Sequence, residues 1–435
     1  MMARQSEGTD LDGFFTTARV AARDEAVTVT SDSYRSFVLD PSDDELSQWR
    51  GMSFRDFSAA KRSPWFVQEL LADWRALYDE PFRGLTEDGT VRPEVWADAA
   101  VSSGTGSPEQ EAAARAAWRL LETLDQPQVE AVSYPIDAPE WRAWSNPEFV
   151  IHEVGLRLEE LALIQADAAL GVVEAALSPE GFARVAEAME LNGFLGDLTD
   201  LPRIMNDRSY WFSLFGEPSA TEPWGFQLFG HHVDINCVFV GGRQVIAPVF
   251  LGAEPALADE RVPLFAHREA LAIALASSLP DAQRSAAVVY QSVLDPAMPE
   301  GRVHPADERH VAGAFRDNRV VPFEGLPVTG LDDSQRELLL EIVEDFLLLL
   351  PEPQRELALA DVERWWGETR LAWYGATDGS QPFYLRIHGP SIIAELDHHA
   401  GVWLTNEVPQ RFHVHTTLRL PHGNDYGKAF LARLR

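Results

Sequence analysis

The spacing of apolar residues changes character about half-way along the chain, close to residue 223. Before that point apolar residues recur every three or four positions, as they do between Trp65 and Leu77, and residues 108–124 form an Ala-rich amphipathic run. This period places side chains on one face of a helix. The pattern therefore predicts a mainly helical part over residues 57–222. Helices are predicted at residues 154–177, 179–191, 267–279, 281–294, 334–350 and 362–370.

From Trp224 the pattern alternates, as expected of strands. Residues 224–251 are predicted to form two strands joined at Gly241-Gly242, because two glycines favour a tight antiparallel turn. Further strands are predicted at LAWYGA, PFYLRIHG, SIIAELDH, GVWLT and RFHVHTTLRL, all after residue 370. The predicted fold class is α+β, with an antiparallel sheet packed against several helices. Residues 1–56 are interpreted as a partly irregular extension, 223–435 as an α+β part, and 57–435 as one integrated body.

Composition narrows the possible partners. The 435 residues carry a net charge of −32, which repels nucleic acid and anionic membrane surfaces. No stretch approaches the ~20 apolar residues of a membrane span. The single cysteine, Cys237, excludes an intramolecular disulfide and is expected to pack in the core. Acidic residues in the N-terminal MMARQSEGTDLDGFF do not suit a signal peptide, so a cytoplasmic protein is expected. Assembly into an oligomer is left open.

Histidines supply the candidate chemistry. In the strand predicted for RFHVHTTLRL, His413 and His415 share one face. In FGHHVDIN the same alternation places His232 and Asp234 on one, polar face of a strand. His231 then lies on the opposite face with the apolar residues. Six of the 12 histidines fall between residues 388 and 422. Neutral imidazoles suit copper, iron and zinc, so His232, His413 and His415 are predicted to bind one divalent transition metal.

Three further residues are predicted to act beside this metal. Glu395 and Asp397 share one face of the strand at residues 391–397, which makes Glu395 a candidate ligand or general base and Asp397 a catalytic candidate. Arg386 lies on a neighbouring predicted strand and could bind an anionic substrate group. His398 and His399 follow the strand and are expected to be exposed loop residues, with a lesser chance that one lines the mouth of the site.

Open positions on a three-histidine metal allow two classes of chemistry on a small-molecule substrate. Copper or iron would give an oxidase or oxygenase, and zinc would give a hydrolase or lyase. The many tryptophans predict a shielded pocket, which slightly favours the redox class. A third alternative is a non-catalytic protein that binds a metal or small molecule. An isolated HxH pair also arises by chance, and the acid that follows such a pair in cupins is absent here. The sequence contains no HExxH, phosphate-loop or GxSxG motif.

Several longer motifs resemble a known family. They include PWGFQLFGHHVDIN, DNRVVPFEGL, RIHGPSIIAELD and HVHTTLRLPHGNDYG. From about Arg55 to its C-terminus the chain is similar to the domain of unknown function 3500 (DUF3500) family, whose name implies no activity. Members tend to have Gln at the position of His388 and polar residues at His398 and His399. These departures argue against His388 or His398 as an essential ligand.

Overall fold

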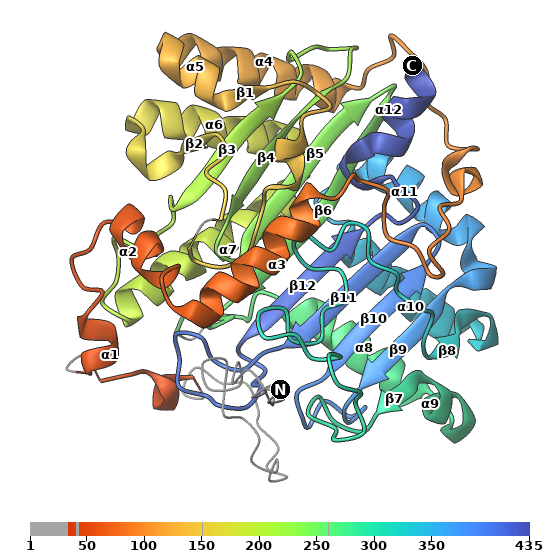
Figure 1. The fold of residues 1–435 in the computed structure, drawn as a ribbon. Helices are drawn as coiled ribbons and strands as arrows, with labels where there is room; N and C mark the ends of the chain where they lie inside the picture. The colour runs from red at the N-terminus through yellow and green to blue at the C-terminus, as the bar shows by residue number, and fades with distance from the viewer. Residues whose placement is uncertain (1–33, 41–42, 150, 260) are drawn as a thin grey trace, which may run out of the picture.

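The computed structural model describes residues 34–40, 43–149, 151–259 and 261–435. Most of the predicted N-terminal extension lies outside these ranges. Within them, a single large sheet forms the centre of the protein, and helices and long loops cover both of its faces (Figure 1). The predicted α+β class is confirmed.

The sheet has 12 strands among the described residues, in the order β1-β3-β4-β5-β6-β12-β11-β10-β9-β7, with β2 paired to β3 and β8 to β9. Most neighbours are antiparallel, but β1 runs parallel to β3 and β7 parallel to β9. The sheet is therefore mixed, and the prediction of a purely antiparallel sheet was wrong at its two ends. The strands are β1 (Ser133–Tyr134), β2 (Leu156–Arg157), β3 (Tyr210–Phe215), β4 (Trp224–Gly230), β5 (Val233–Val240), β6 (Arg243–Ala253), β7 (Val288–Tyr290), β8 (Leu326–Pro327), β9 (Arg370–Tyr374), β10 (Tyr384–Gly389), β11 (Ile392–His398) and β12 (Val414–Arg419).

Helices pack against both faces of this sheet. The helices are α1 (Asp44–Ser47), α2 (Phe54–Lys61), α3 (Trp65–Asp79), α4 (Pro108–Thr123), α5 (Gln126–Val132), α6 (Leu163–Ala176), α7 (Pro179–Leu198), α8 (Ala266–Ser278), α9 (Asp281–Ala287), α10 (Asp333–Phe346), α11 (Glu352–Arg364) and α12 (Lys428–Leu434). Apolar residues of α4, α6, α7, α8 and α10 form one core with one face of the sheet. Residues of α2, α3 and α12 pack on the other face, and α3 crosses in front of the sheet in Figure 1.

The segment that carries His231 and His232 differs from its prediction. It was expected to lie within one strand, but β4 ends at Gly230 and β5 begins at Val233, so the two histidines form the turn of a hairpin. His232 has a φ of 67°, in the left-handed region that residues with a Cβ adopt at some energetic expense. Alternation within β5 is as predicted, because Val233, Ile235 and Cys237 point into the core shared with the helices.

A second difference concerns residues 401–405, GVWLT, which form no strand. The backbone N–H groups of Val402, Trp403 and Leu404 instead donate to the buried carboxylate of Glu254, at 2.9, 3.1 and 3.0 Å from Oε1. A loop that wraps a carboxylate directs successive N–H groups inward, which a strand cannot do. This loop lies next to the strand that carries the HxH pair.

Among the helices of the described residues, none combines the length and apolar character that crossing a membrane requires.

Candidate metal centre

The HxH pair lies where β12 begins, in the middle of the sheet: His413 immediately precedes the strand and His415 is its second residue. His415 is the register partner of Asp397 on β11 and of Gly252 on β6. Beyond Gly252 lies the β4–β5 turn, where the carbonyl oxygen of His232 accepts a hydrogen bond of 2.9 Å from the Gly252 N–H. A Cβ on Gly252 would lie 2.7 Å from the ring of His415 and 2.9 Å from that of His232. Glycine at this position therefore lets the two imidazoles meet across β6.

The three predicted ligands converge on one point. Nε2 of His415 lies 3.1 Å from Nε2 of His232 and 3.0 Å from Nε2 of His413. Nitrogens bound ~2.0–2.1 Å from a tetrahedral metal lie about 3.3 Å from one another, so these spacings are close to those of a ligand set. The side chains of all three residues are buried.

Hydrogen bonding alone does not account for this contact. Nδ1 of His413 lies 2.7 Å from the carbonyl oxygen of Ala400, which can only accept, so the proton of neutral His413 is on Nδ1 and its Nε2 carries a bare lone pair. Nε2 of His415 cannot then satisfy both neighbours with one proton. A cation among the three nitrogens would satisfy all of them.

The protonation states also suit a metal. Burial lowers the pKa of His413 to about 4, and burial together with neighbouring imidazoles holds the pKa values of His232 and His415 well below the ordinary value. All three rings are therefore neutral at pH 7. Metal ligands must be deprotonated, and a neutral ring needs only the tautomer that leaves Nε2 bare, so no net release of protons from these rings is required at neutral pH.

Glu395 lies in the same polar face but is occupied by other partners. Its oxygens accept hydrogen bonds from the N–H groups of Val311 and Ala312 at 2.8 and 3.0 Å, and from the hydroxyls of Tyr384 and Thr417 at 2.6 and 2.9 Å. Burial alone would raise its pKa, but His310 and these donors lower it well below the ordinary value. Such a carboxylate is a weak base, and the geometry favours a positioning role over the predicted role of ligand or base.

His310 lies against Glu395, and no motif or periodicity in the sequence pointed to it. It lies in the irregular segment before β8, with Nδ1 at 3.6 Å from Oε2 of Glu395 and 3.3 Å from Oγ1 of Thr417. Its Nε2 is buried and has no hydrogen-bond partner. Burial opposes a charge on this ring, but the Glu395 carboxylate raises its pKa overall.

The other two catalytic candidates are held in ion pairs. Asp397 accepts a hydrogen bond of 2.7 Å from Nε of Arg309, and both side chains are buried. Arg386 lies 2.6 Å from Oε2 of Glu324. Asp397 shares the row of His415 across the sheet, whereas Arg386 is the register partner of Glu395 and belongs to the next row. The structure thus brings Asp397 to the histidines and directs Arg386 toward Glu324.

The expectation that His398 and His399 are exposed was wrong. Both side chains are buried, at 0% and 3% relative exposure. His398 turns toward the backbone of Phe383, 3.0 Å from its Nδ1. The ring of His399 lies against His415, with centroids 3.9 Å apart. The segment after β11 folds back over the sheet instead of entering solvent, because residues 401–405 are anchored by Glu254.

A comparison with family models places the chain among known sequences. The model of a family described as Protein of unknown function (DUF3500) matches residues 107–428. The chain belongs to this family. The matched range contains His232, His413, His415 and the residues around them, so the candidate centre of this DUF3500 protein lies inside the family's own region. Neither the curated proteins nor the solved structures that were compared gave a match.

A small cavity of this DUF3500 protein is lined by His231, the neighbour of the candidate ligand His232. That ring stacks on His232 with centroids 3.8 Å apart, and its Nδ1 lies 2.8 Å from Oδ1 of Asn192. The cavity is also lined by Ser145 and Arg157. Oγ of Ser145 and Nη2 of Arg157 are buried without a hydrogen-bond partner. Polar groups are therefore available to a bound molecule next to His231.

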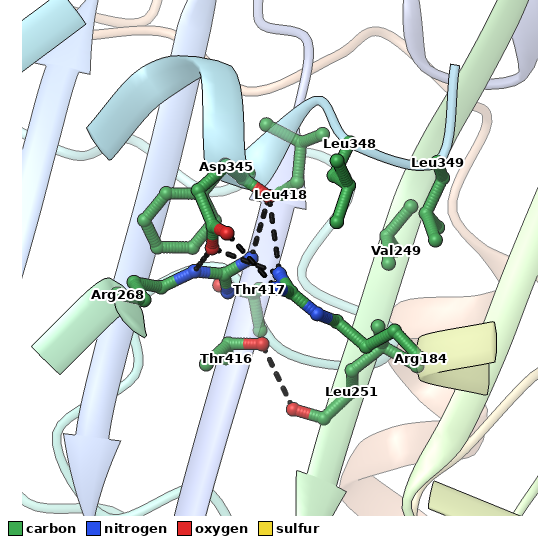
Figure 2. A pocket seen from close by; sticks show the side chains of 11 residues that line it. Arg184, Val249, Leu251, Arg268, Asp345, Leu348, Leu349, Thr416, Thr417 and Leu418 are labelled. Atoms are coloured by element: carbon green, nitrogen blue, oxygen red, sulfur yellow. Dashed lines mark hydrogen bonds and ion pairs between the residues drawn. The ribbon is translucent and has the colours of Figure 1, made fainter. Parts of the chain in front are cut away.

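A second cavity of this DUF3500 protein has a structural role. Figure 2 shows it between β12 and the helices α7, α8 and α10, where Arg184 and Arg268 both bind Asp345. Oδ2 of Asp345 lies 2.8 Å from Nη1 of Arg184 and 2.7 Å from Nε of Arg268. Its lining includes none of the histidines. We interpret it as an ion-pair junction between α7, α8 and α10.

Proposed function

We propose that this protein is a metal-dependent enzyme that acts on a small molecule through a centre bound by His232, His413 and His415. The observation that carries the proposal is the convergence of three neutral Nε2 atoms, at 3.0 and 3.1 Å, in a buried site. Three imidazoles leave at least one coordination position open for a substrate or a water. That open position is what separates a catalytic metal from a structural one.

The preferred activity is that of a copper- or iron-dependent oxidase or oxygenase. A bound redox metal would supply electron transfer to or from substrate and dioxygen. An all-nitrogen ligand set suits this chemistry, and the ring of Phe250 packs against His415 with centroids 4.9 Å apart. The ring of Phe250 and the burial of the three histidines would limit the access of solvent to the metal, which protects a reactive centre from side reactions.

The residues around the ligands would keep them in place during turnover. The Ala400 carbonyl fixes the tautomer of His413, and Glu254 lies 3.8 Å from the same Nδ1. Burial raises the pKa of Glu254 to about 7. Hydrogen-bonded oxygens behind a ligating imidazole orient the ring and increase its basicity.

The cavity beside His231 supports a small polar substrate. Arg157 has a free N–H donor there, and Ser145 has a free hydroxyl. A guanidinium binds carboxylate or phosphate oxygens. We therefore propose a substrate with at least one anionic or strongly polar group, which would approach the metal past His231.

Zinc is the principal alternative, because the same three imidazoles bind it and it would activate water for a hydrolase or lyase reaction. The buried carboxylate of Asp397, in register with His415, is the observation that favours this alternative. A non-catalytic metal or small-molecule binding protein is the remaining possibility.

The test is elemental analysis of untagged protein, with visible and electron paramagnetic resonance spectra before and after reduction by ascorbate and re-oxidation by air. Copper or iron at near-stoichiometric occupancy, with a reversible spectral change, would support the oxidase or oxygenase. Zinc would support the hydrolase or lyase. Stoichiometric metal without a detectable open position would support the binding protein. Loss of metal from His413→Ala but not from a His267→Ala control is expected in each case, and absence of metal from the wild type would overturn the proposal.

A further inference from the structure

We propose that His310, Asp397 and His399 bind a second divalent metal ion beside the first, so that the centre is dinuclear. This inference extends the proposed function and rests on it for the first metal position. The ligand atoms of His310, Asp397 and His399 lie within 4.8 Å of one another, the same limit that the first three histidines meet. All three side chains are buried.

Unsatisfied nitrogens point to a ligand at this second position. Nε2 of His310 has no hydrogen-bond partner. Nε2 of His399 lies 3.2 Å from Oδ2 of Asp397, yet the contact does not have the geometry of a hydrogen bond. A buried polar atom without a partner loses its hydration without compensation, and here two such nitrogens lie beside one carboxylate. A cation among these atoms would bind both imidazole lone pairs and Oδ2 of Asp397, whose one hydrogen bond, from the backbone N–H of Arg309, is long at 3.2 Å.

The surrounding residues orient two of the three ligands for this role. Glu395 and Thr417 lie on the Nδ1 side of His310, so its Nε2 faces the other way. Oδ1 of Asp397 accepts a hydrogen bond from Nε of Arg309. Its Oδ2 faces His399 and accepts only a long hydrogen bond, of 3.2 Å, from the backbone N–H of Arg309. A carboxylate behind a ligating histidine and a hydrogen-bonded ligating carboxylate are the usual supports of a metal site.

Acidic groups surround the imidazoles, which independently favours a cation. The buried carboxylates of Glu254, Glu395 and Asp397 have an oxygen at 3.8, 3.6 and 3.2 Å from a nitrogen of His413, His310 and His399, respectively, and the half-buried Glu308 lies 3.7 Å from His399. Arg309 pairs with two of them, Asp397 and Glu308. A buried carboxylate that is charged is costly without a cation beside it, and a bound divalent ion would supply one at Asp397 and Glu395.

The two positions are adjacent. His399 belongs to the second group and His415 to the first, and their rings lie 3.9 Å apart, centroid to centroid. His310 and His415 are 6.4 Å apart on the same measure. Asp397 is the register partner of His415. Two ions held by these groups would therefore be close enough to act on one substrate.

The donor sets differ, which indicates the class of each metal. The first position offers imidazole nitrogens alone, and the second adds a carboxylate oxygen. A carboxylate is a harder donor that suits iron, manganese or zinc better than reduced copper. We infer a divalent ion of that class at the second position, whichever metal the first one holds.

The test uses apo-protein titrated with Co²⁺, followed by visible absorption and by the metal-to-protein ratio after gel filtration. Wild type is expected to bind two equivalents. His310→Ala and, as a milder change, His310→Gln should each bind one, while His267→Ala should still bind two. Thermal unfolding of each apo-variant checks that it is folded. Ions in neighbouring positions should also broaden each other's electron paramagnetic resonance signal, and removing the second site should sharpen it.

The outcomes separate the two proposals. One equivalent in wild type that persists in His310→Ala but is lost in His413→Ala would overturn the second site and leave the first. No binding by wild type would overturn both. Two equivalents in wild type that both persist in folded His310→Gln and His399→Gln would place the second ion elsewhere and overturn the inference.

Discussion

The imidazole rings of His399 and His415 lie 3.9 Å apart, centroid to centroid, in the buried centre of the sheet. This contact joins the three histidines predicted from the sequence to a second group, His310, Asp397 and His399. Burial and neighbouring rings keep the pKa values of both imidazoles well below the ordinary value, so the contact is between neutral rings. Because of this contact, the cluster of buried histidines extends beyond His413, His415 and His232.

Metal removal should destabilise the protein. A ligand at 100 times its Kd stabilises the folded state by ~2.7 kcal/mol, and in a chain of this size we expect dialysis against EDTA to lower the Tm by about 5 °C. Adding metal back should restore it. Differential scanning calorimetry measures the shift. A double variant, His413→Ala with His310→Ala, should respond little to EDTA, and an equal Tm of wild type with and without EDTA would contradict the prediction.

Gly252→Ala should disrupt the metal site with little effect on the rest of the fold. The new methyl group would meet the rings of His415 and His232 at 2.7 and 2.9 Å and force them apart. We expect the Co²⁺ affinity to fall by at least tenfold, measured by titration calorimetry. Gly171→Ala is the matched control, because a Cβ there meets nothing within 4 Å. Unchanged affinity in Gly252→Ala would show that the rings do not need this approach.

Glu395→Gln should weaken the second metal position selectively. The amide retains the volume of the carboxylate but removes the charge opposite Nδ1 of His310, which lies 3.6 Å away. Losing a partner behind a ligating histidine typically reduces metal affinity by roughly 10–100-fold. Titration with Co²⁺ should show one affinity reduced and the other retained. A surface change, Glu363→Gln, should alter neither, and equal loss at both positions would argue that Glu395 is itself a shared ligand.

The Asp345 junction should give a pH-dependent contribution to stability. The Arg184 and Arg268 guanidinium groups outweigh the effect of burial and lower the pKa of Asp345 to about 2, below the ~3.9 of an unfolded aspartate. A lowered pKa stabilises the folded state at pH values above the unfolded pKa, and this stabilisation is lost as the pH falls toward 2. Asp345→Asn should therefore cost ~3–5 kcal/mol at neutral pH, because it leaves the buried Arg268 and the half-buried Arg184 with weakened pairing.

Urea unfolding at several pH values tests this. The difference in unfolding free energy between wild type and Asp345→Asn should be constant from pH 7 to about pH 5 and shrink below pH 4. Comparing the two proteins at each pH cancels the protonation of the metal ligands, which they share. A difference that stays constant down to pH 3 would contradict the lowered pKa.

Local pattern was sufficient for much of the fold. The three-to-four-residue period predicted α4 nearly to the residue, and alternation predicted β9 to β12, because these features depend on which side chains face the core. His413 and His415 were likewise paired by parity within one strand. Such relationships extend over a few residues of one element, so the sequence contains all the information they need.

Other features depended on contacts between distant segments. His232 lies in a turn, and the β4–β5 hairpin became evident only from the pairing of Gly230 with Val233. The parallel pairs at the ends of the sheet also could not be seen in any single strand's pattern. Burial of His399 follows from the Glu254 carboxylate that anchors residues 401–405, about 150 positions away in the chain.

The sequence by itself determined that histidines gather on strands of an acidic α+β protein, with His413 and His415 on one face. Tertiary structure decided which other groups meet them. It placed His310, from a loop without periodicity, beside Glu395, and it buried His399 against His415. The physical reason is that alternation fixes the direction of a side chain relative to its own strand, whereas coordination depends on distances between strands and loops that only packing sets.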